Sequence, residues 1–404
     1  SLFDVLQSPI EGIVQGGEII AFLFIVGGAF SIVSRTKAID LGILKIVNVF
    51  KGKEILVLPI LMFMFSVGGA TFGMSEEAIA FVAVLMPLVL ALGYDSIVAV
   101  AITYLACNLG FSAAMLNPFT VGIAQSIAGI QLYSGVEFRT LVWFVSTLVG
   151  CGFVMFYAMK IKKNPELSPM FEHDQVKREK LKSTESEHTE FTLRHKIIIA
   201  ALFTSIALVV YGVLKLEFWI PQIAAVFLGL GIISGLVGKL APNEIAEAFT
   251  DGAKDMIGAA IMIGLAKSVM IIAQNANIID TILFNLANVV GQLPSLIASY
   301  IMFVIQMFIN FFVSSGSGQA ALTMPILAPL GDLVGISRQL SVLIYQLGDG
   351  FSNAMFPTSG VLIACLGMAG VPYGKWLKWI LPLQAILFMT AIVFITIASL
   401  IGWA

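Results

Sequence analysis

The chain has 404 residues, of which 59% are hydrophobic and 11% are charged. Soluble domains carry about 25% charged residues, so this composition excludes an ordinary soluble protein and indicates a polytopic membrane protein. The net charge of -2 shows no basic excess, so nucleic acid is not an expected partner.

Few residues suit catalysis or a bound metal. Cys107, Cys151 and Cys365 lie far apart in apolar segments, where cysteine usually fills the core. The three histidines lie in or beside one polar stretch, and no ATP-binding G-x-x-x-x-G-K-[ST] motif occurs. The sequence therefore predicts no enzyme, no cofactor and no histidine-based metal site.

The first 53 residues contain one predicted membrane span. Residues 1–15 are expected to form an interfacial lead-in, and residues 17–34 are long enough to span, since a span needs roughly 17–25 apolar residues. The connector that follows is basic, which places it on the cytoplasmic side. Within it, residues 40–50 are predicted to form an amphipathic helix at the membrane surface.

A re-entrant hairpin is predicted next. Residues 54–68 are apolar, but a helix of this length rises only about 22 Å, less than the roughly 30 Å hydrocarbon core. A polar, glycine-rich turn at about 68–77 and a second apolar run at 78–92 follow. Non-helical backbone at that depth is tolerated only inside protein or beside a cavity.

A broken helix and a linker complete the first half. Residues 96–130 are predicted to form a spanning helix that breaks at Gly110–Pro118, and residues 138–160 span back. The long hydrophilic stretch 161–194 mixes charges of both signs. We expect it to be a solvated cytoplasmic linker without chemistry of its own.

The second half repeats this plan with one extra span. It contains a second predicted hairpin, with its tip in F-V-S-S-G-S-G-Q, and a second broken helix. The predicted elements are spans at 195–215, 218–238 and 256–275, amphipathic connectors at 243–255 and 278–290, hairpin arms at 295–312 and 320–333, a broken helix at 339–370 with its break at Gly348–Pro357, and a last span at 376–402.

Two similar stretches mark the repeat. They read G-F-S-A-A-M-L-N-P from Gly110 and G-F-S-N-A-M-F-P from Gly350, at a separation of 240. Counting spans from the linker places the two hairpins in opposite orientations, so the repeats are predicted to be inverted. Paired breaks in the two halves of a hydrophobic chain are the best sequence indication of a transporter's binding site.

Three motifs carry a resemblance to a known family. G-G-A-T-F-G-M-S-E-E-A-I-A-F (68–81), N-P-F-T-V-G-I-A (117–124) and I-I-D-T-I-L (278–283) resemble the YfcC-type basic amino acid antiporters, related to the anaerobic four-carbon dicarboxylate carriers of the ion-transporter superfamily. The resemblance implies a multi-pass carrier of a bacterial inner membrane, a homodimer, and elevator-type alternating access. It also implies that the N-terminal scaffold helix is missing from this chain.

The fold class predicted in this way is an all-α polytopic membrane protein with inverted repeats, a scaffold and an elevator-type transport domain. The predicted division is scaffold at 1–53, transport domain at 54–130, connecting span at 131–160, cytoplasmic linker at 161–194, scaffold at 195–290, transport domain at 291–370 and last span at 371–404.

Four polar clusters, two at hairpin tips and two at helix breaks, are expected to converge on one site. Half-helix N-termini there suit a carboxylate, at roughly 0.3–2 kcal/mol per terminus, and free carbonyls suit Na⁺ or an ammonium group. The candidate residues are Thr71, Ser75, Glu76 and Glu77 at the first tip; Asn108, Ser112, Asn117 and Thr120 at the first break; Ser314, Ser315, Ser317 and Gln319 at the second tip; and Asp349, Ser352, Asn353, Thr358 and Ser359 at the second break.

Charged side chains are the most informative, because a charge at the bilayer centre costs roughly 2.5–3.5 kcal/mol. Glu76 or Glu77 is predicted to face substrate or a proton; alternatively, one of them caps the following half-helix. Asp349 is predicted to contact substrate or a cation, or to bind freed backbone at its own break. Lys267 could pair with one of these acids or with a substrate carboxylate; alternatively, it snorkels to the membrane surface or pairs within the scaffold.

Six other residues are expected at membrane interfaces. Three are charged residues at predicted helix or hairpin ends, and three are tryptophans that flank the last span, as in an aromatic belt. They are Asp95, Asp332, Arg338, Trp376, Trp379 and Trp403.

The leading hypothesis is a secondary carrier, an antiporter or an ion-coupled transporter, for amino acids and first of all a basic one. The half-helix ends can hold an α-carboxylate, and the acids can balance a cationic group. Coupling would be to Na⁺ or H⁺, with Na⁺ near the tips. The alternatives are a four-carbon dicarboxylate carrier, for which the site holds many acids, and an ion channel, for which no lining ring is found.

Overall fold

The structure, a computed structural model, describes residues 2–39, 41, 54–186, 192–216, 218–278, 281, 285 and 290–403. All regular elements in these ranges are helical, which confirms the all-α class. The connectors predicted at 40–50 and 278–290 lie almost entirely outside the described residues.

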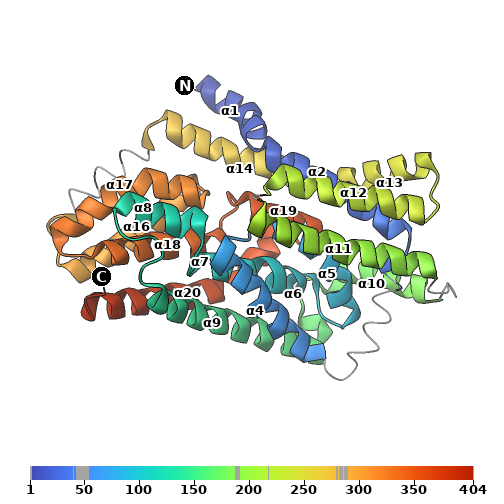
Figure 1. The fold of residues 1–404 in the computed structure, drawn as a ribbon, viewed down its shortest axis with the longest axis horizontal. Helices are drawn as coiled ribbons and strands as arrows, with labels where there is room; N and C mark the ends of the chain where they lie inside the picture. The colour runs from blue at the N-terminus through green and yellow to red at the C-terminus, as the bar shows by residue number, and fades with distance from the viewer. Residues whose placement is uncertain are drawn as a thin grey trace.

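One set of helices, which we name the outer group, lies along the top of Figure 1 and reaches down to α11. In it α2 packs along α12 and α13, α1 packs along α14, and α11 packs on α12. Its members are α1 (Leu2–Gln15), α2 (Gly17–Arg35), α11 (Leu193–Lys215), α12 (Ile220–Val237), α13 (Pro242–Asp255) and α14 (Ile257–Asn275).

The inner group contains both predicted hairpins and both broken helices. From the first half it takes α4 (Glu54–Phe72), α5 (Glu77–Ala91), α6 (Ser96–Val100), the π-helix η1 (Ala101–Leu105), α7 (Ala106–Ser112), the π-helix η2 (Pro118–Gly122), α8 (Ile123–Ala128) and α9 (Val136–Lys163). From the second half it takes α16 (Ser295–Phe312), α17 (Gly316–Val334), α18 (Arg338–Asn353), α19 (Gly360–Ala369) and α20 (Tyr373–Leu400). The outer group meets it where α14 and α2 contact α19 and α5.

The helices break later than the sequence predicts. The chain is helical through Ser112 and again through Asn353, so the G-F-S stretches end the incoming helices and do not interrupt them. Their glycines allow close packing: a Cβ at Gly110 would collide with the carbonyl of Ser66, and one at Gly350 would collide with Ser112. A helix tolerates glycine when a neighbouring backbone needs that space.

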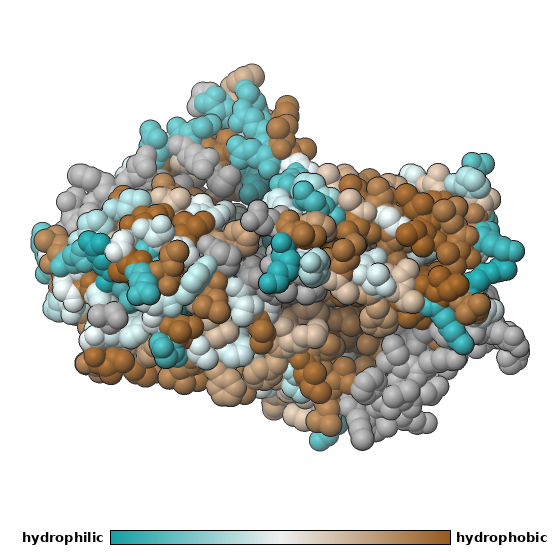
Figure 2. Space-filling view, in the orientation of Figure 1, coloured by the Kyte–Doolittle hydropathy of each residue, from teal (hydrophilic) through white to brown (hydrophobic). Residues whose placement is uncertain are grey.

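The described helices fit a membrane protein by length and composition. Five of them, α2, α9, α12, α16 and α20, are long and apolar enough to cross a bilayer. Large apolar side chains such as Phe156 and Met389 are well exposed, and Figure 2 shows hydrophobic side chains across much of one face. Together with the composition, these helices indicate a multi-pass membrane protein.

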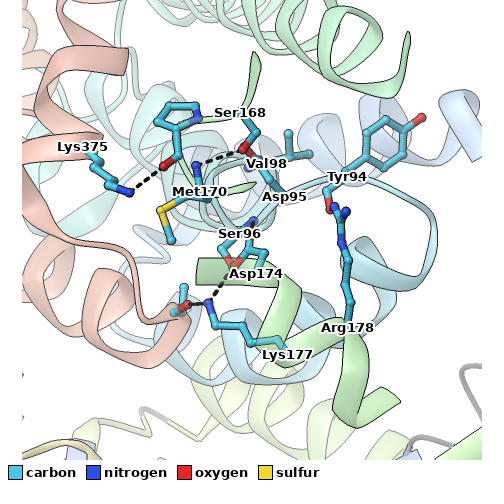
Figure 3. Close-up of polar contacts among 12 residues, drawn as sticks. Tyr94, Asp95, Ser96, Val98, Ser168, Met170, Asp174, Lys177, Arg178 and Lys375 are labelled. Carbon is cyan, nitrogen blue, oxygen red and sulfur yellow. Dashed lines mark hydrogen bonds and ion pairs between the residues drawn. The ribbon is translucent and has the colours of Figure 1, made fainter. Parts of the chain in front are cut away.

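In the segment 165–178, the prediction of a solvated linker is wrong for Ser168, Met170 and Asp174, which are buried, while most of the residues around them are exposed. This segment forms the 3-10 helix η3 (Pro165–Leu167) and the start of α10 (Phe171–Ser186). Asp174, which is fully buried, accepts hydrogen bonds from the backbone N–H and the hydroxyl of Ser96 and pairs with Lys177 at 2.9 Å (Figure 3). The mixed charges of the linker therefore find partners at helix ends and do not all face water.

This linker segment joins the two repeats. Lys177 also donates to the carbonyl of Ala369 at the end of α19, and Lys375 at the start of α20 donates to the carbonyl of Pro169. On the other side, Arg178 donates to the carbonyl of Tyr94 (Figure 3). The ends of α5 and α6 are thus tied to those of α19 and α20.

Asp95 lies at a helix end, as predicted, but it is buried inside the protein. It is 1% exposed, and its carboxylate caps α6 by accepting from the Val98 N–H while Ser168 and Tyr157 donate to its other oxygen. The linker supplies Ser168, so the sequence around Asp95 alone gives no sign of this burial.

Two of the three predicted belt tryptophans are also buried. Trp376 is 0% exposed and donates its indole N–H to the carbonyl of Ala354, and Trp379 stacks on it at 5.1 Å. For Trp376 the place beside the second break explains the difference, because its indole N–H satisfies a carbonyl that the break leaves free. Trp403 lies over the buried guanidinium of Arg139.

We predict that Asp174→Ala lowers the free energy of unfolding by about 1–3 kcal/mol, because it leaves the buried N–H of Ser96 without its acceptor. Thermal unfolding in detergent measures this loss. Asp251→Asn is the matched control, since Asp251 forms only exposed ion pairs with Arg35 and Lys254 and such pairs contribute about 0–1 kcal/mol. Equal stability of both variants would contradict a structural linker.

Candidate functional site

A cavity of about 340 Å³ lies between the inner and outer groups. Both predicted hairpin tips and residues next to both helix breaks line it. Its lining residues are Gln15, Glu18, Ile19, Gly73, Met74, Ser75, Glu76, Tyr104, Cys107, Asn108, Phe111, Phe119, Trp219, Ile220, Lys267, Ser314, Ser315, Gly316, Ser317, Asn353, Ser359, Gly360 and Val361.

Each tip is bound to the break of its own repeat. In the first repeat the N–H groups of Met115 and Leu116 both donate to the carbonyl of Ala70 at 3.0 Å. In the second repeat the Ser314 hydroxyl donates to the carbonyl of Thr358 at 2.7 Å. In both repeats the hairpin and the break are therefore held together, although through different groups.

The two broken helices are bound to each other. Asn108 donates to the carbonyl of Gly350 at 3.2 Å, and Gln346 donates to the carbonyl of Phe111 at 2.6 Å. Tyr104, inside the π-helix η1, donates to the carbonyl of Asn353 at 3.0 Å. These bonds use carbonyls at the helix ends, which would otherwise lack partners.

Three helices present their N-terminal ends to the cavity. They are α5, α17 and α19, whose first residues or N-caps Glu76, Ser315, Gly316, Ser359 and Gly360 line it. Ser315 and Ser359 cap their helices through Gly318 N–H and Leu362 N–H. Convergent N-termini concentrate free N–H donors and partial positive charge, which suits an anionic group.

The two adjacent glutamates lie in different surroundings. Glu77 is 8% exposed and its carboxylate accepts from the Ser75 N–H at 3.1 Å, within the tip. Glu76 has no capping bond and lines the cavity. It interacts electrostatically with Lys267 and with Glu18, both on outer-group helices. Glu77 therefore binds backbone within the tip, whereas Glu76 faces the cavity.

Of the predicted residues, nine line the cavity and nine do not. Those that line it are Ser75, Glu76, Asn108, Lys267, Ser314, Ser315, Ser317, Asn353 and Ser359. Those that do not are Thr71, Glu77, Ser112, Asn117, Thr120, Gln319, Asp349, Ser352 and Thr358.

Most of the residues outside the lining bind backbone or one another. Thr71, Ser112 and Ser352 donate to carbonyls one turn earlier, which is common for hydroxyls in helices. Asn117 caps η2 through the Phe119 N–H, and Gln319 donates to Gln306.

Sequence reasoning missed several lining residues. Glu18, at the start of a predicted span, and Gln15 come from the outer group, and nothing local distinguishes them from interfacial residues. Phe119 and Trp219 form an aromatic pair, at 5.7 Å between ring centroids, across the two groups. This contact could not be predicted, because it depends on how the two helix groups pack against each other.

A model of the family DcuC, C4-dicarboxylate anaerobic carrier, matches residues 3–400. The chain is 42% identical over 416 residues to the "Putative basic amino acid antiporter YfcC" of Escherichia coli, an alignment that covers 99% of this chain and 82% of the relative. A relative from Haemophilus influenzae is 34% identical over 96% of this chain and 76% of its own length. The solved YdaH transporter of Alcanivorax borkumensis aligns over 100% of this chain and 89% of its own, with TM-score 0.49 and 15% identity.

We predict that Gly110→Ala destabilises the inner group by about 1–3 kcal/mol or more, because its methyl group would meet the Ser66 carbonyl. Gly152→Ala in α9 is the matched control: nothing lies within 4 Å of its added Cβ, and alanine favours a helix over glycine by about 1 kcal/mol. Thermal unfolding of both detergent-purified variants should show a loss only for the first.

Proposed function

Because the chain belongs to the C4-dicarboxylate anaerobic carrier family, we propose that it is a secondary transporter that carries a basic amino acid through the cavity between its two helix groups. Because this family is described as a family of carriers, transport is the first hypothesis for the function. The substrate is inferred from the charges around the cavity.

The charges of the lining carry the proposal. Glu18 and Glu76 are acidic and Lys267 is basic, a net charge of -1. A basic amino acid carries two cationic groups and one carboxylate, which is the opposite set. Charge complementarity of this kind selects partners more than it adds affinity.

The carboxylate of the substrate would lie near Lys267 and the helix N-termini. The ends of α5, α17 and α19 offer N–H donors, and Ser317 adds a hydroxyl. The cationic groups would then lie toward Glu76 and Glu18. Aromatic rings at Phe119 and Trp219 suit the aliphatic stem or a guanidinium group.

The grouping of the helices suits elevator-type alternating access. Residues 54–130 and 291–370 would move as the transport domain against a scaffold of 1–53 and 195–290, with 131–160, the linker and the last span, 371–404, beside them. The two tips lie on the moving side, and Glu18 and Lys267 lie on the other. A homodimer in a bacterial inner membrane would hold the scaffold fixed, with lipid around it.

The second candidate is a four-carbon dicarboxylate, which the family description and Lys267 favour. Its second carboxylate would lie beside Glu18 and Glu76. Like charges so placed repel one another unless one of the acids is protonated. Competition between arginine and succinate separates the two candidates.

In liposomes loaded with unlabelled arginine, the purified protein should take up external labelled arginine by counterflow. Excess succinate should not compete, because the cavity has one lysine for its two carboxylates. If arginine, lysine and ornithine all fail to exchange while succinate does, the dicarboxylate candidate replaces the amino acid.

Glu76→Gln should raise the half-saturating arginine concentration about tenfold, since it removes a charge-assisted contact. Glu77→Gln is the matched neighbour, because its side-chain carbonyl can still accept from the Ser75 N–H. It should change half-saturation less than Glu76→Gln. The reverse order would contradict the assignment of Glu76 to the substrate.

A further inference from the structure

A second polar site lies behind the cavity wall, on α18. Asp349 is 0% exposed, and neither of its carboxylate oxygens has a hydrogen-bond partner. The backbone of the same residue is satisfied, since its carbonyl accepts from Asn310 at 2.9 Å. A buried carboxylate without any partner is costly, so its charge is expected to be neutralised by a proton or by a bound cation.

Two further buried oxygens without partners belong to the same place. The Gln346 Oε1 lies on α18 three positions before Asp349, which puts both on one helix face. Its amide nitrogen donates to the Phe111 carbonyl, and that bond fixes which end is the oxygen. The Thr120 hydroxyl, also 0% exposed and unpartnered, comes from η2, which packs on α18.

Gly316, the first residue of α17, joins this site to the cavity. A Cβ on Gly316 would lie 2.7 Å from Thr120 Cγ2 and 3.3 Å from Asp349 Oδ2, so both side chains flank its Cα. Gly316 itself lines the cavity, and its carbonyl accepts from the Tyr345 hydroxyl at 2.6 Å. One residue without a side chain therefore separates the two sites.

We propose that Asp349, Gln346 and Thr120 bind a dehydrated Na⁺ ion. Carboxylate, amide and hydroxyl oxygens are the ligands that hard cations prefer, and one carboxylate neutralises one positive charge. Protonation of Asp349 is the competing way to neutralise the buried carboxylate, and the response to NaCl separates the two. That the ion is coupled to substrate movement rests on the proposed function; that it binds does not.

The ion would connect three parts of the inner group. Asp349 and Gln346 belong to the second broken helix, Thr120 follows the first break, and Gly316 begins the helix after the second tip. These three elements pack on one another in pairs. Occupation of the site would therefore favour the arrangement in which the second tip closes the cavity.

The test is thermal unfolding of the purified protein, without amino acid, in NaCl titrated against choline chloride at constant ionic strength. The wild type should show an unfolding temperature that rises and saturates with NaCl. Asp349→Asn should abolish this rise and should be at least as stable as the wild type in choline chloride, because it removes an unpaired buried charge. Thr120→Val should shift half-saturation about tenfold upward.

The exposed acid Asp332, which pairs with Arg338 at 2.8 Å, provides the control: Asp332→Asn should keep the wild-type response to NaCl. A wild type that does not respond to NaCl, or an Asp349→Asn variant that responds like the wild type, overturns the site. Stabilisation by acid in choline chloride alone would assign Asp349 to a proton and also overturn it. Arginine counterflow is measured separately, so failure of the substrate proposal is distinguished from failure of the ion site.

Discussion

Close contact between helix backbones is the constraint on which the rest of the structure depends. Gly110 lies against the Ser66 carbonyl and Gly350 against Ser112, so any side chain at either glycine would separate the helices. The close approach of α7 and α18 lets Asn108 on α7 donate to the Gly350 carbonyl, and Gln346 on α18 donate to the Phe111 carbonyl. Beyond the contact both helices end, and the helices that resume present their N-termini to a common cavity. The polar site thus follows from tight apolar packing beside it.

The acids of the inner group differ in whether their carboxylates accept hydrogen bonds. Asp174 and Glu77 accept from backbone N–H groups and hold local structure. Glu76 faces the cavity, and Asp349 is buried with neither a donor nor an opposite charge at its oxygens. A buried charge without partners is unfavourable, and of these acids only Asp349 is in that state, because Glu76 is partly exposed and has Lys267 as an opposite charge nearby.

Helix positions could be predicted from the sequence because apolar run length and glycine-proline clusters are local signals. The same signals misled at Gly348 and Gly350, which read as helix breakers but serve close packing, a feature that only the neighbouring helix reveals. The convergence of the two hairpin tips on one site could be predicted from the inverted sequence repeat. Glu18 could not be predicted as a lining residue, because its position depends on how the outer group meets the inner one. The burial of Asp95 and Trp376 could not be predicted, because their partners, Ser168 and the Ala354 carbonyl, are distant in sequence.

The linker bears on how the two groups could move. Lys177 ties Ser96 to the end of α19, and Lys375 at the start of α20 donates to the Pro169 carbonyl of the linker. The helices α6, α19 and α20 all belong to the inner group. A displacement of the inner group against the outer one would leave these bonds intact. It would separate Glu76 from Lys267 and Glu18, and Phe119 from Trp219, which face each other across the two groups. The charge set that complements a basic amino acid would then exist in only one arrangement of the groups, so motion alone would weaken substrate binding and favour release.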